Sequence, residues 1–226
     1  VTDGGISVNS GEDYKAAEWW QIRDLRRSLL DAGLMALDEA LKIMEANETD
    51  FITWTATESY TVFNELFVKK TETFDRWFSI NTSRKTFLAL RPAMLECYHQ
   101  YFAKVFNAAT IATIKTGVDD VQKQVLQFVQ ASLVNYTVSK VVHNGAFVLT
   151  SSGMYQQFDE LPGYKQNPLS AEHLHTLKVD RLTAGEEYFK EAIRLIEANA
   201  DLFTDYETKA TSTVVSVKNT KSTFSL

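Results

Sequence analysis

The chain has almost no cysteine and no long apolar run. Its single cysteine, Cys97, excludes an internal disulfide and a zinc site built from several cysteines. No stretch of about 18 consecutive apolar residues occurs, so no transmembrane helix is predicted. The 226 residues include only 3 Pro and 9 Gly, and no proline precedes Pro92. Because these residues interrupt helices, their scarcity favours long helices over many short strands.

Clustered positive charge is also missing. The chain carries 23 Lys and Arg against 29 Asp and Glu, with a net charge of −6, and the basic residues are scattered among acids. A nucleic-acid-binding surface needs a positive footprint to displace counterions, so nucleic acid is not an expected partner. Attraction to anionic lipid headgroups is weak for the same reason. The hydrophobic fraction of 45% is that of a globular protein with a buried core.

No residue pattern predicts a catalytic centre. Glu96 and His99 have the Glu-x-x-His spacing of a di-iron helical bundle, but such sites need a second motif and two further carboxylates, which the sequence does not supply in matching positions. Cys97 lies among large apolar residues of an expected helix, which indicates a buried and inert thiol. Gly-rich phosphate loops and Gly-x-Ser-x-Gly motifs do not occur. We therefore expect a non-enzymatic protein with no catalytic residue, metal ligand or cofactor.

What the sequence does contain is a repeated segment. Residues 32–47 recur 152 positions later as residues 184–199, with seven of sixteen positions identical. Both copies begin with Ala-Gly and end with Glu-Ala-Asn. The repeat predicts a duplicated helical hairpin in which the two segments are equivalent helices. Gly33 and Gly185 should each lie where another helix approaches closely, because glycine inside a helix costs about 1 kcal/mol relative to alanine.

Apolar periodicity and capping residues predict an all-α fold, an elongated antiparallel bundle of about five long helices. The predicted helices cover residues 10–47, 49–80, 83–115, 116–131 and 170–199. Pro92 falls inside the third helix and predicts a kink or a later start. We expect one domain, in which residues 1–158 form the bundle with the first repeat copy. Residues 159–169 form a loop, and residues 170–226 pack the second copy on the same bundle.

Residues 133–150 have two interpretations. Two β-branched runs surround Asn144 and Gly145, a strong local signal for a β-hairpin. A helix through the same residues would instead bury Val134, Val138 and Val141, and we favour the helix in so helical a chain. An exposed hairpin or tongue would make residues 133–150 a membrane-binding or partner-binding segment. Its candidate contact residues are Val138, Val141, Val142, Phe147 and Val148.

Three Asn-x-Ser/Thr triplets indicate the cellular compartment in which the protein is expected. Asn47, Asn81 and Asn135 each begin one and are candidate glycosylation sites. Asn47 and Asn81 fall near predicted helix ends, where a glycan can be accommodated. The triplets favour a secreted glycoprotein, and mass spectrometry of protein from its native source would test this expectation.

Two functional hypotheses follow from these observations. The favoured one is an extracellular helical binding or assembly protein that recognises a protein partner or a small apolar ligand. The alternative is a pore-forming, membrane-active toxin component that acts through residues 133–150. Only the alternative makes a membrane an expected partner, so leakage from liposomes would separate the two hypotheses.

Overall fold

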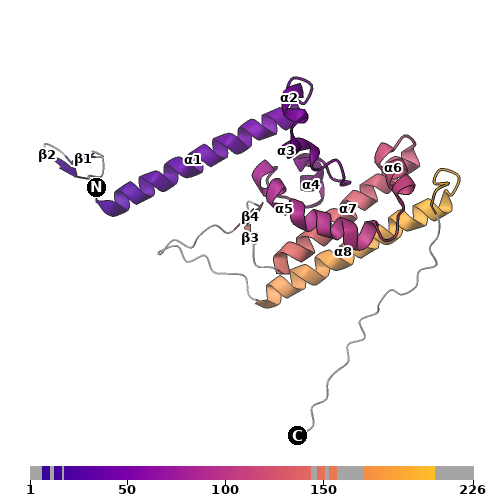
Figure 1. The fold of residues 1–226 in the computed structure, drawn as a ribbon. Helices are drawn as coiled ribbons and strands as arrows, with labels where there is room; N and C mark the ends of the chain where they lie inside the picture. The colour runs from indigo at the N-terminus through magenta and orange to yellow at the C-terminus, as the bar shows by residue number, and fades with distance from the viewer. Residues whose placement is uncertain are drawn as a thin grey trace, which may run out of the picture.

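The computed structural model describes residues 7–10, 13–16, 18–143, 147–150, 153–156 and 171–206. Helices dominate this part of the chain, which confirms the all-α class (Figure 1). The helices are α1 (Trp19–Ala46), α2 (Ile52–Thr55), α3 (Glu58–Thr61), α4 (Thr71–Trp77), α5 (Arg84–Cys97), α6 (Ala108–Thr116), α7 (Asp120–His143) and α8 (Ala171–Ala198). A π-helical turn, η1 (Tyr98–Phe102), follows α5 directly. Two antiparallel strand pairs accompany the helices, β1 (Ser7–Ser10) with β2 (Asp13–Ala16), and β3 (Phe147–Thr150) with β4 (Gly153–Gln156).

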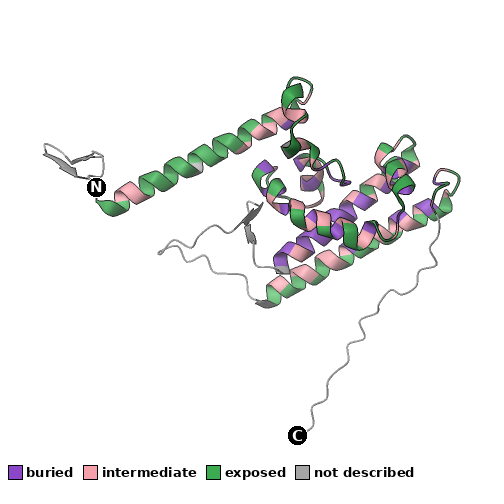
Figure 2. Cartoon of the chain, in the orientation of Figure 1, coloured by how far each residue is buried: buried purple, intermediate pink, exposed green. Residues whose placement is uncertain are grey.

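Helix α7 forms the centre of the body and is covered from several sides. It contacts α4, α5, α6 and α8, and residues 131–139 are all buried. Figure 2 shows this burial as the main purple segment. Because α7 is covered on more than one side, its apolar residues do not need to keep to one stripe. The aromatic side chains of the preceding segments, such as Phe63, Phe74, Phe87 and Phe102, complete the same core.

Helices α7 and α8 pack side by side in opposite directions (Figure 1). The hydroxyl of Ser132 donates to the carbonyl of Gly185 at 2.8 Å, and the hydroxyl of Ser139 donates to the carbonyl of Lys178 at 2.9 Å. Residue numbers therefore rise on one helix as they fall on the other. These buried hydroxyl groups satisfy their hydrogen-bonding requirement through the neighbouring helix, which sets the register of the pair.

The expected helix over residues 49–80 is wrong, because the structure divides it into α2, α3 and α4. The hydroxyl groups of Thr55, Thr57 and Thr61 each donate to a backbone carbonyl three or four residues earlier, at 2.6–3.0 Å. Such local hydrogen bonds compete with a continuous helix and favour turns and short helices. The chain between the short helices turns Phe63 and Phe67 into the core.

The expected helix over residues 83–115 forms in pieces. Ser83 caps α5 as predicted, with its side chain accepting from the N–H of Thr86. Pro92 lies inside α5. The helix continues through η1 and ends before α6, where the Asn107 side chain accepts from the N–H of Thr110 at 2.8 Å and begins a new helix. The break follows from this second cap. The expected bundle of about five long helices is therefore not observed: among the described residues α1, α7 and α8 have 24 residues or more, and the other helices are shorter.

Residues 133–143 are helical, as the favoured interpretation predicted, but a helix through the whole of 133–150 is wrong, because α7 ends at His143 and residues 147–150 form a strand. Val138, Val141 and Val142 are buried in α7 against the rest of the core. The strand pair that follows is β3 with β4, in which Thr150 faces Gly153, so its turn lies beyond the Asn144–Gly145 pair. Phe147 and Val148 form part of β3, and their side chains lie outside the described residues, as does the expected loop at 159–169.

Candidate functional site

Helix α1 is held to the body by a buried ion pair near its C-terminal end. Glu45 accepts from the guanidinium of Arg84 at 3.1 Å and from the N–H of Thr71 at 2.9 Å. The Arg84 side chain is 1% exposed. Burial lowers the pKa of Arg84, while the Glu45 carboxylate raises it again. This ion pair joins α1, α4 and α5 at one point.

Aromatic rings surround the guanidinium of Arg84. Its central carbon lies 5.0–5.9 Å from the ring centroids of Trp54, Tyr60, Phe63 and Phe87. An aromatic cage of this kind can bind a cationic ligand, but the chain fills the cage with its own arginine. We therefore interpret the cluster as the anchor of α1 and not as a ligand site.

Beyond this anchor, α1 projects from the body as a single helix (Figure 1). Figure 2 shows most of its length as exposed. The described contacts of α1 with the body lie near its C-terminal end. The one farthest from the Glu45–Arg84 ion pair is a hydrogen bond in which the N–H of Lys85 donates to the Asp38 carboxylate at 2.9 Å. Large apolar side chains on the projecting part are exposed to solvent: Trp19, Trp20, Leu25, Leu29, Leu30, Leu34, Met35, Leu37 and Ile43.

Most of these side chains belong to one face of α1. We define the α1 apolar face as Ile22, Leu25, Leu29, Leu30, Leu34, Leu37, Leu41 and Met44. Its last five members follow alternating spacings of four and three residues, the pattern of a helix that packs against another helix. Polar residues such as Asp24, Ser28 and Glu39 lie on the opposite side.

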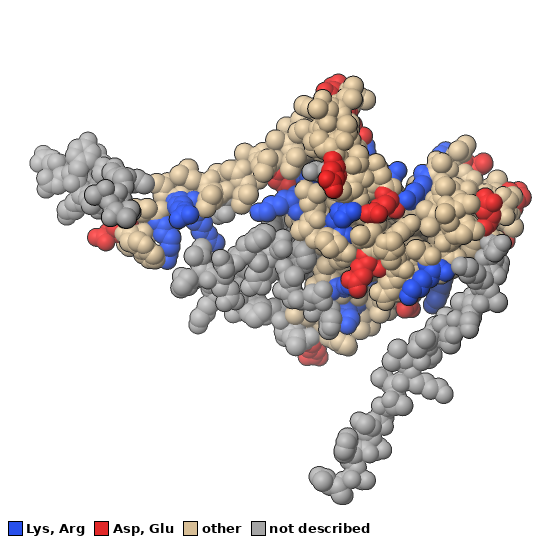
Figure 3. Space-filling model, viewed as in Figure 1, with Lys and Arg blue, Asp and Glu red and all other residues tan. Residues whose placement is uncertain are grey.

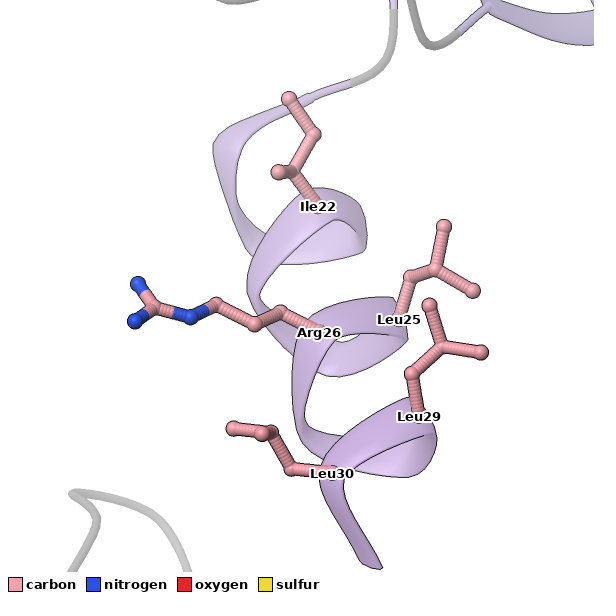
Figure 4. Close-up of a pocket in the computed structure, with 5 residues that line it drawn as sticks. All are labelled: Ile22, Leu25, Arg26, Leu29 and Leu30. Carbon is pink, nitrogen blue, oxygen red and sulfur yellow. The ribbon is translucent and has the colours of Figure 1, made fainter. Parts of the chain in front are cut away.

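The N-terminal part of this face borders a hollow of about 400 Å³. The described lining residues, Ile22, Leu25, Arg26, Leu29 and Leu30, all belong to α1. Figure 4 shows Leu25 and Leu29 pointing to the same side of the helix, while Arg26 extends in another direction. A hollow lined by one helix is a surface that a second helix can cover.

Helix α8 shows how the same sequence unit packs when it has a neighbour. The helices α1 and α8 both have 28 residues, and their bounds coincide at the repeat offset. Asn47 and Asn199 each donate a side-chain N–H to the carbonyl four residues earlier at 2.8 Å. On α8 six of the eight positions that match the α1 apolar face lie against the core, including Leu182 and Phe189, whereas Leu29 and Leu34 correspond to Arg181 and Glu186. On α1 most of the same positions face solvent.

The two glycines differ in the same way. A methyl group at Gly185 would lie 2.8 Å from the ring of Tyr136, so this glycine occupies the close helix contact that the sequence predicted. At Gly33 no described atom lies within 4 Å of the same methyl position, so the described part of the chain does not supply the expected contact. The α1 unit thus retains a glycine that costs about 1 kcal/mol in a helix, and no described neighbour requires it.

Replacing Gly185 with alanine is expected to lower the free energy of unfolding by about 1–3 kcal/mol, because the new methyl group overpacks a core with no room for it. Tyr136 cannot move aside easily, because its ring also stacks on the ring of Tyr101, with the two ring centroids 4.0 Å apart. Urea unfolding followed by circular dichroism measures the change. The matched control is Gly33→Ala, which should not destabilise the monomer; equal losses for both variants would contradict the assigned contact.

The three candidate glycosylation residues have different environments. Asn47 ends α1, and Asn81 is exposed with a φ angle of 57°. Asn135 is 2% exposed, and its side chain donates to the carbonyl of Ala131 and accepts from Arg181. A glycan on Asn135 does not fit this fold, so only Asn47 and Asn81 remain as candidates.

The structure also places the three residues that the sequence suggested for metal binding or catalysis, which are Glu96, His99 and Cys97. Glu96 forms an ion pair with Lys140, and His99 lies in η1 beside the ring of Tyr98. Within the described residues, no group of three His, Cys, Asp or Glu side chains could hold a metal ion. Burial raises the pKa of the Cys97 thiol to about 11, so the thiolate is scarce at neutral pH.

Two further observations concern the surface. Basic and acidic side chains are interspersed on the face of the body shown in Figure 3. Within the described part of the chain, no helix combines the length and the apolarity needed to span a membrane. Val138, Val141 and Val142, three of the five candidate contact residues of the membrane-active alternative, are buried and not exposed to solvent.

Comparison with known proteins identifies the family. Residues 1–64 and 91–215 match the family of unknown function DUF6712, and the chain belongs to this family. No curated protein and no solved structure matches the chain.

Proposed function

We propose that this DUF6712 member is a non-enzymatic assembly protein that docks another protein through the α1 apolar face. The observation that carries the proposal is the exposure of this face along a projecting helix. Soluble monomers rarely expose contiguous apolar patches of this extent, and larger ones mark sites of interaction. A helix that presents side chains at alternating spacings of three and four fits the helix-in-groove mode of protein recognition.

The body supplies a rigid base for this helix. The buried pair of Glu45 and Arg84 fixes the C-terminal end of α1 against α4 and α5. A protein partner suits the face better than a small apolar ligand, because the hollow beside it is lined by one helix in the described structure. Small-molecule sites bury most of the ligand between several elements. The secreted location favoured by Asn47 and Asn81 remains a prediction.

Photo-crosslinking tests the proposal. With benzoylphenylalanine in place of Leu34, ultraviolet light applied to cells that produce the protein naturally should yield a protein adduct, because Leu34 lies in the face that the partner covers. Benzoylphenylalanine in place of Glu39, on the polar side of the same helix, is the matched control and should yield far less. Adduct formation that is equal at the two positions, or absent at Leu34, would overturn the proposed function.

A further inference from the structure

The α1 apolar face has no described partner in its own chain, whereas α8 uses the matching face to pack on α7. The contrast is sharpest at the glycines, since Gly185 meets Tyr136 and Gly33 meets nothing. A glycine in a helix contact permits close approach of a second backbone. The occupant of the α1 face is therefore expected to be a helix that crosses near Gly33.

The sequence of α1 is complementary to itself about Gly33. If two copies of α1 pair antiparallel with a two-fold axis near this glycine, residues at equal distances before and after Gly33 lie at the same level. Apolar residues then meet apolar residues in the pairs Ile22 with Met44, Leu25 with Leu41 and Leu29 with Leu37. Arg26, which interrupts the face, is level with the small residue Ala40. An isologous contact of this kind uses one surface twice.

The charges on α1 favour the antiparallel direction. Its N-terminal half carries three Arg against two Asp, and Figure 3 shows basic side chains gathered near this end. The C-terminal half carries Asp38, Glu39 and Glu45 against Lys42. Antiparallel pairing brings the basic half of each copy beside the acidic half of the other, whereas parallel pairing places like charges together. Complementary charges of this kind select partner and orientation more than they add affinity.

The body leaves most of the face accessible. Five of its eight members, Leu25, Leu29, Leu30, Leu34 and Leu37, are exposed, whereas Ile22, Leu41 and Met44 are half-buried. The contacts of Asp38 and Glu45 with the body lie in the C-terminal part of α1. A 28-residue helix extends about 42 Å at 1.5 Å per residue, so two such helices can lie side by side with the bodies at opposite ends.

We propose that the α1 apolar face docks the α1 helix of a second copy of this chain, in an antiparallel pair centred near Gly33. The proposal rests on the proposed function and names its partner. The pair buries both apolar faces, and it supplies the helix contact that Gly33 does not make within one chain.

Disulfide trapping tests both the partner and the direction. Two full-length variants, Ile22→Cys and Met44→Cys, are oxidised separately and as an equimolar mixture. The mixture should form at least about tenfold more disulfide-linked dimer than either variant alone, because only the antiparallel pair brings these positions within bridging distance. Cys97 is buried and its raised pKa disfavours the thiolate, so the unmodified chain serves as a blank. The polar-side variants Asp24→Cys and Lys42→Cys, which lie level with each other but point away, are the matched control.

The outcomes separate this inference from the proposed function. Dimer formed by Ile22→Cys alone would show a parallel pair and overturn the proposed direction. A chain that stays monomeric in analytical ultracentrifugation, with no trapped dimer, would overturn the self-association. If the Leu34 photo-crosslink then joins a different protein, the proposed function stands and only the second copy is excluded; if it joins nothing, both fail.

Discussion

Replacing Val141 with aspartate is expected to unfold the protein. Val141 is 3% exposed in α7, with Val138 and Val142 buried beside it. A carboxylate at this position loses its hydration, and the native core was not built to pair it with a cation. The expected loss in the free energy of unfolding is at least about 4 kcal/mol, a large part of the stability of an ordinary domain. Far-UV circular dichroism and the urea midpoint measure it.

The matched control for this variant is Val118→Asp. Val118 is 76% exposed just before α7, so an aspartate there stays hydrated and should change the stability by less than about 0.5 kcal/mol. A Val141→Asp variant that keeps its helical signal and its urea midpoint would contradict the burial of this part of α7. It would also restore the exposed-tongue interpretation, on which the same substitution leaves the fold intact.

Replacing Arg84 with methionine is expected to lower the free energy of unfolding by about 3–5 kcal/mol, because it leaves the buried carboxylate of Glu45 without its cation. The N–H of Thr71 would remain as a hydrogen-bond donor to that carboxylate. The aromatic rings around Arg84 can pack against methionine, so the loss comes from the uncompensated charge and not from an empty cage. Urea unfolding measures the change, and faster amide hydrogen exchange at the C-terminal end of α1 would locate it.

A double variant separates charge from packing at this anchor. Arg84→Met combined with Glu45→Gln removes both charges and should recover most of the lost stability. The exposed pair of Lys123 and Asp120 supplies a surface control, since Lys123→Met should change the stability by less than about 1 kcal/mol. If Arg84→Met is as mild as the surface variant, the ion pair does not anchor α1 to the body.

Several local features of the fold were predictable from the sequence. The caps at Ser83 and the repeated Asn47 and Asn199 are short-range patterns that depend on a few neighbouring residues. The helical assignment of residues 133–143 followed from the spacing of the buried valines. Whether the two similar helices come from a duplication stays a prediction. The Asn residues at their C-terminal ends form the same hydrogen bond, whereas Glu18 precedes α1 and Ser170 precedes α8, so the two helices share a local signal for their ends and not for their starts.

The division of residues 49–80 into short helices was not predicted, although a signal was present. Thr55, Thr57 and Thr61 form a threonine-rich stretch whose hydroxyl groups can replace helical hydrogen bonds with local ones. Aromatic residues at helical spacing outweighed this signal in the prediction. Their burial does not require one helix, because a chain that turns can also direct Phe63 and Phe67 into the core.

The open face of α1 was also not predicted, and here the local sequence is not sufficient. A broad apolar face predicts that a helix packs against something, but it does not say whether the neighbour belongs to the same chain. Ala36, where α8 has Tyr188, is a weak signal of a different neighbour. The candidate site therefore became visible only when the body was seen to leave α1 uncovered.

The sequence by itself determined that two long helices end at Asn47 and Asn199, because periodicity, caps and backbone hydrogen bonds act within a few residues. The expected start of the first helix at Ser10 is wrong, because residues 7–10 and 13–16 pair as strands and α1 begins at Trp19. Only the tertiary structure decided which of the two helices the core would cover. At the position where α1 has Leu37, α8 has Phe189. The centroid of the Phe189 ring lies 5.0 Å from that of Phe102 and 5.6 Å from that of Phe106. Helix α8 packs along α7, whereas the described contacts of α1 with the body lie near its C-terminal end, so most of the matching face of α1 stays open.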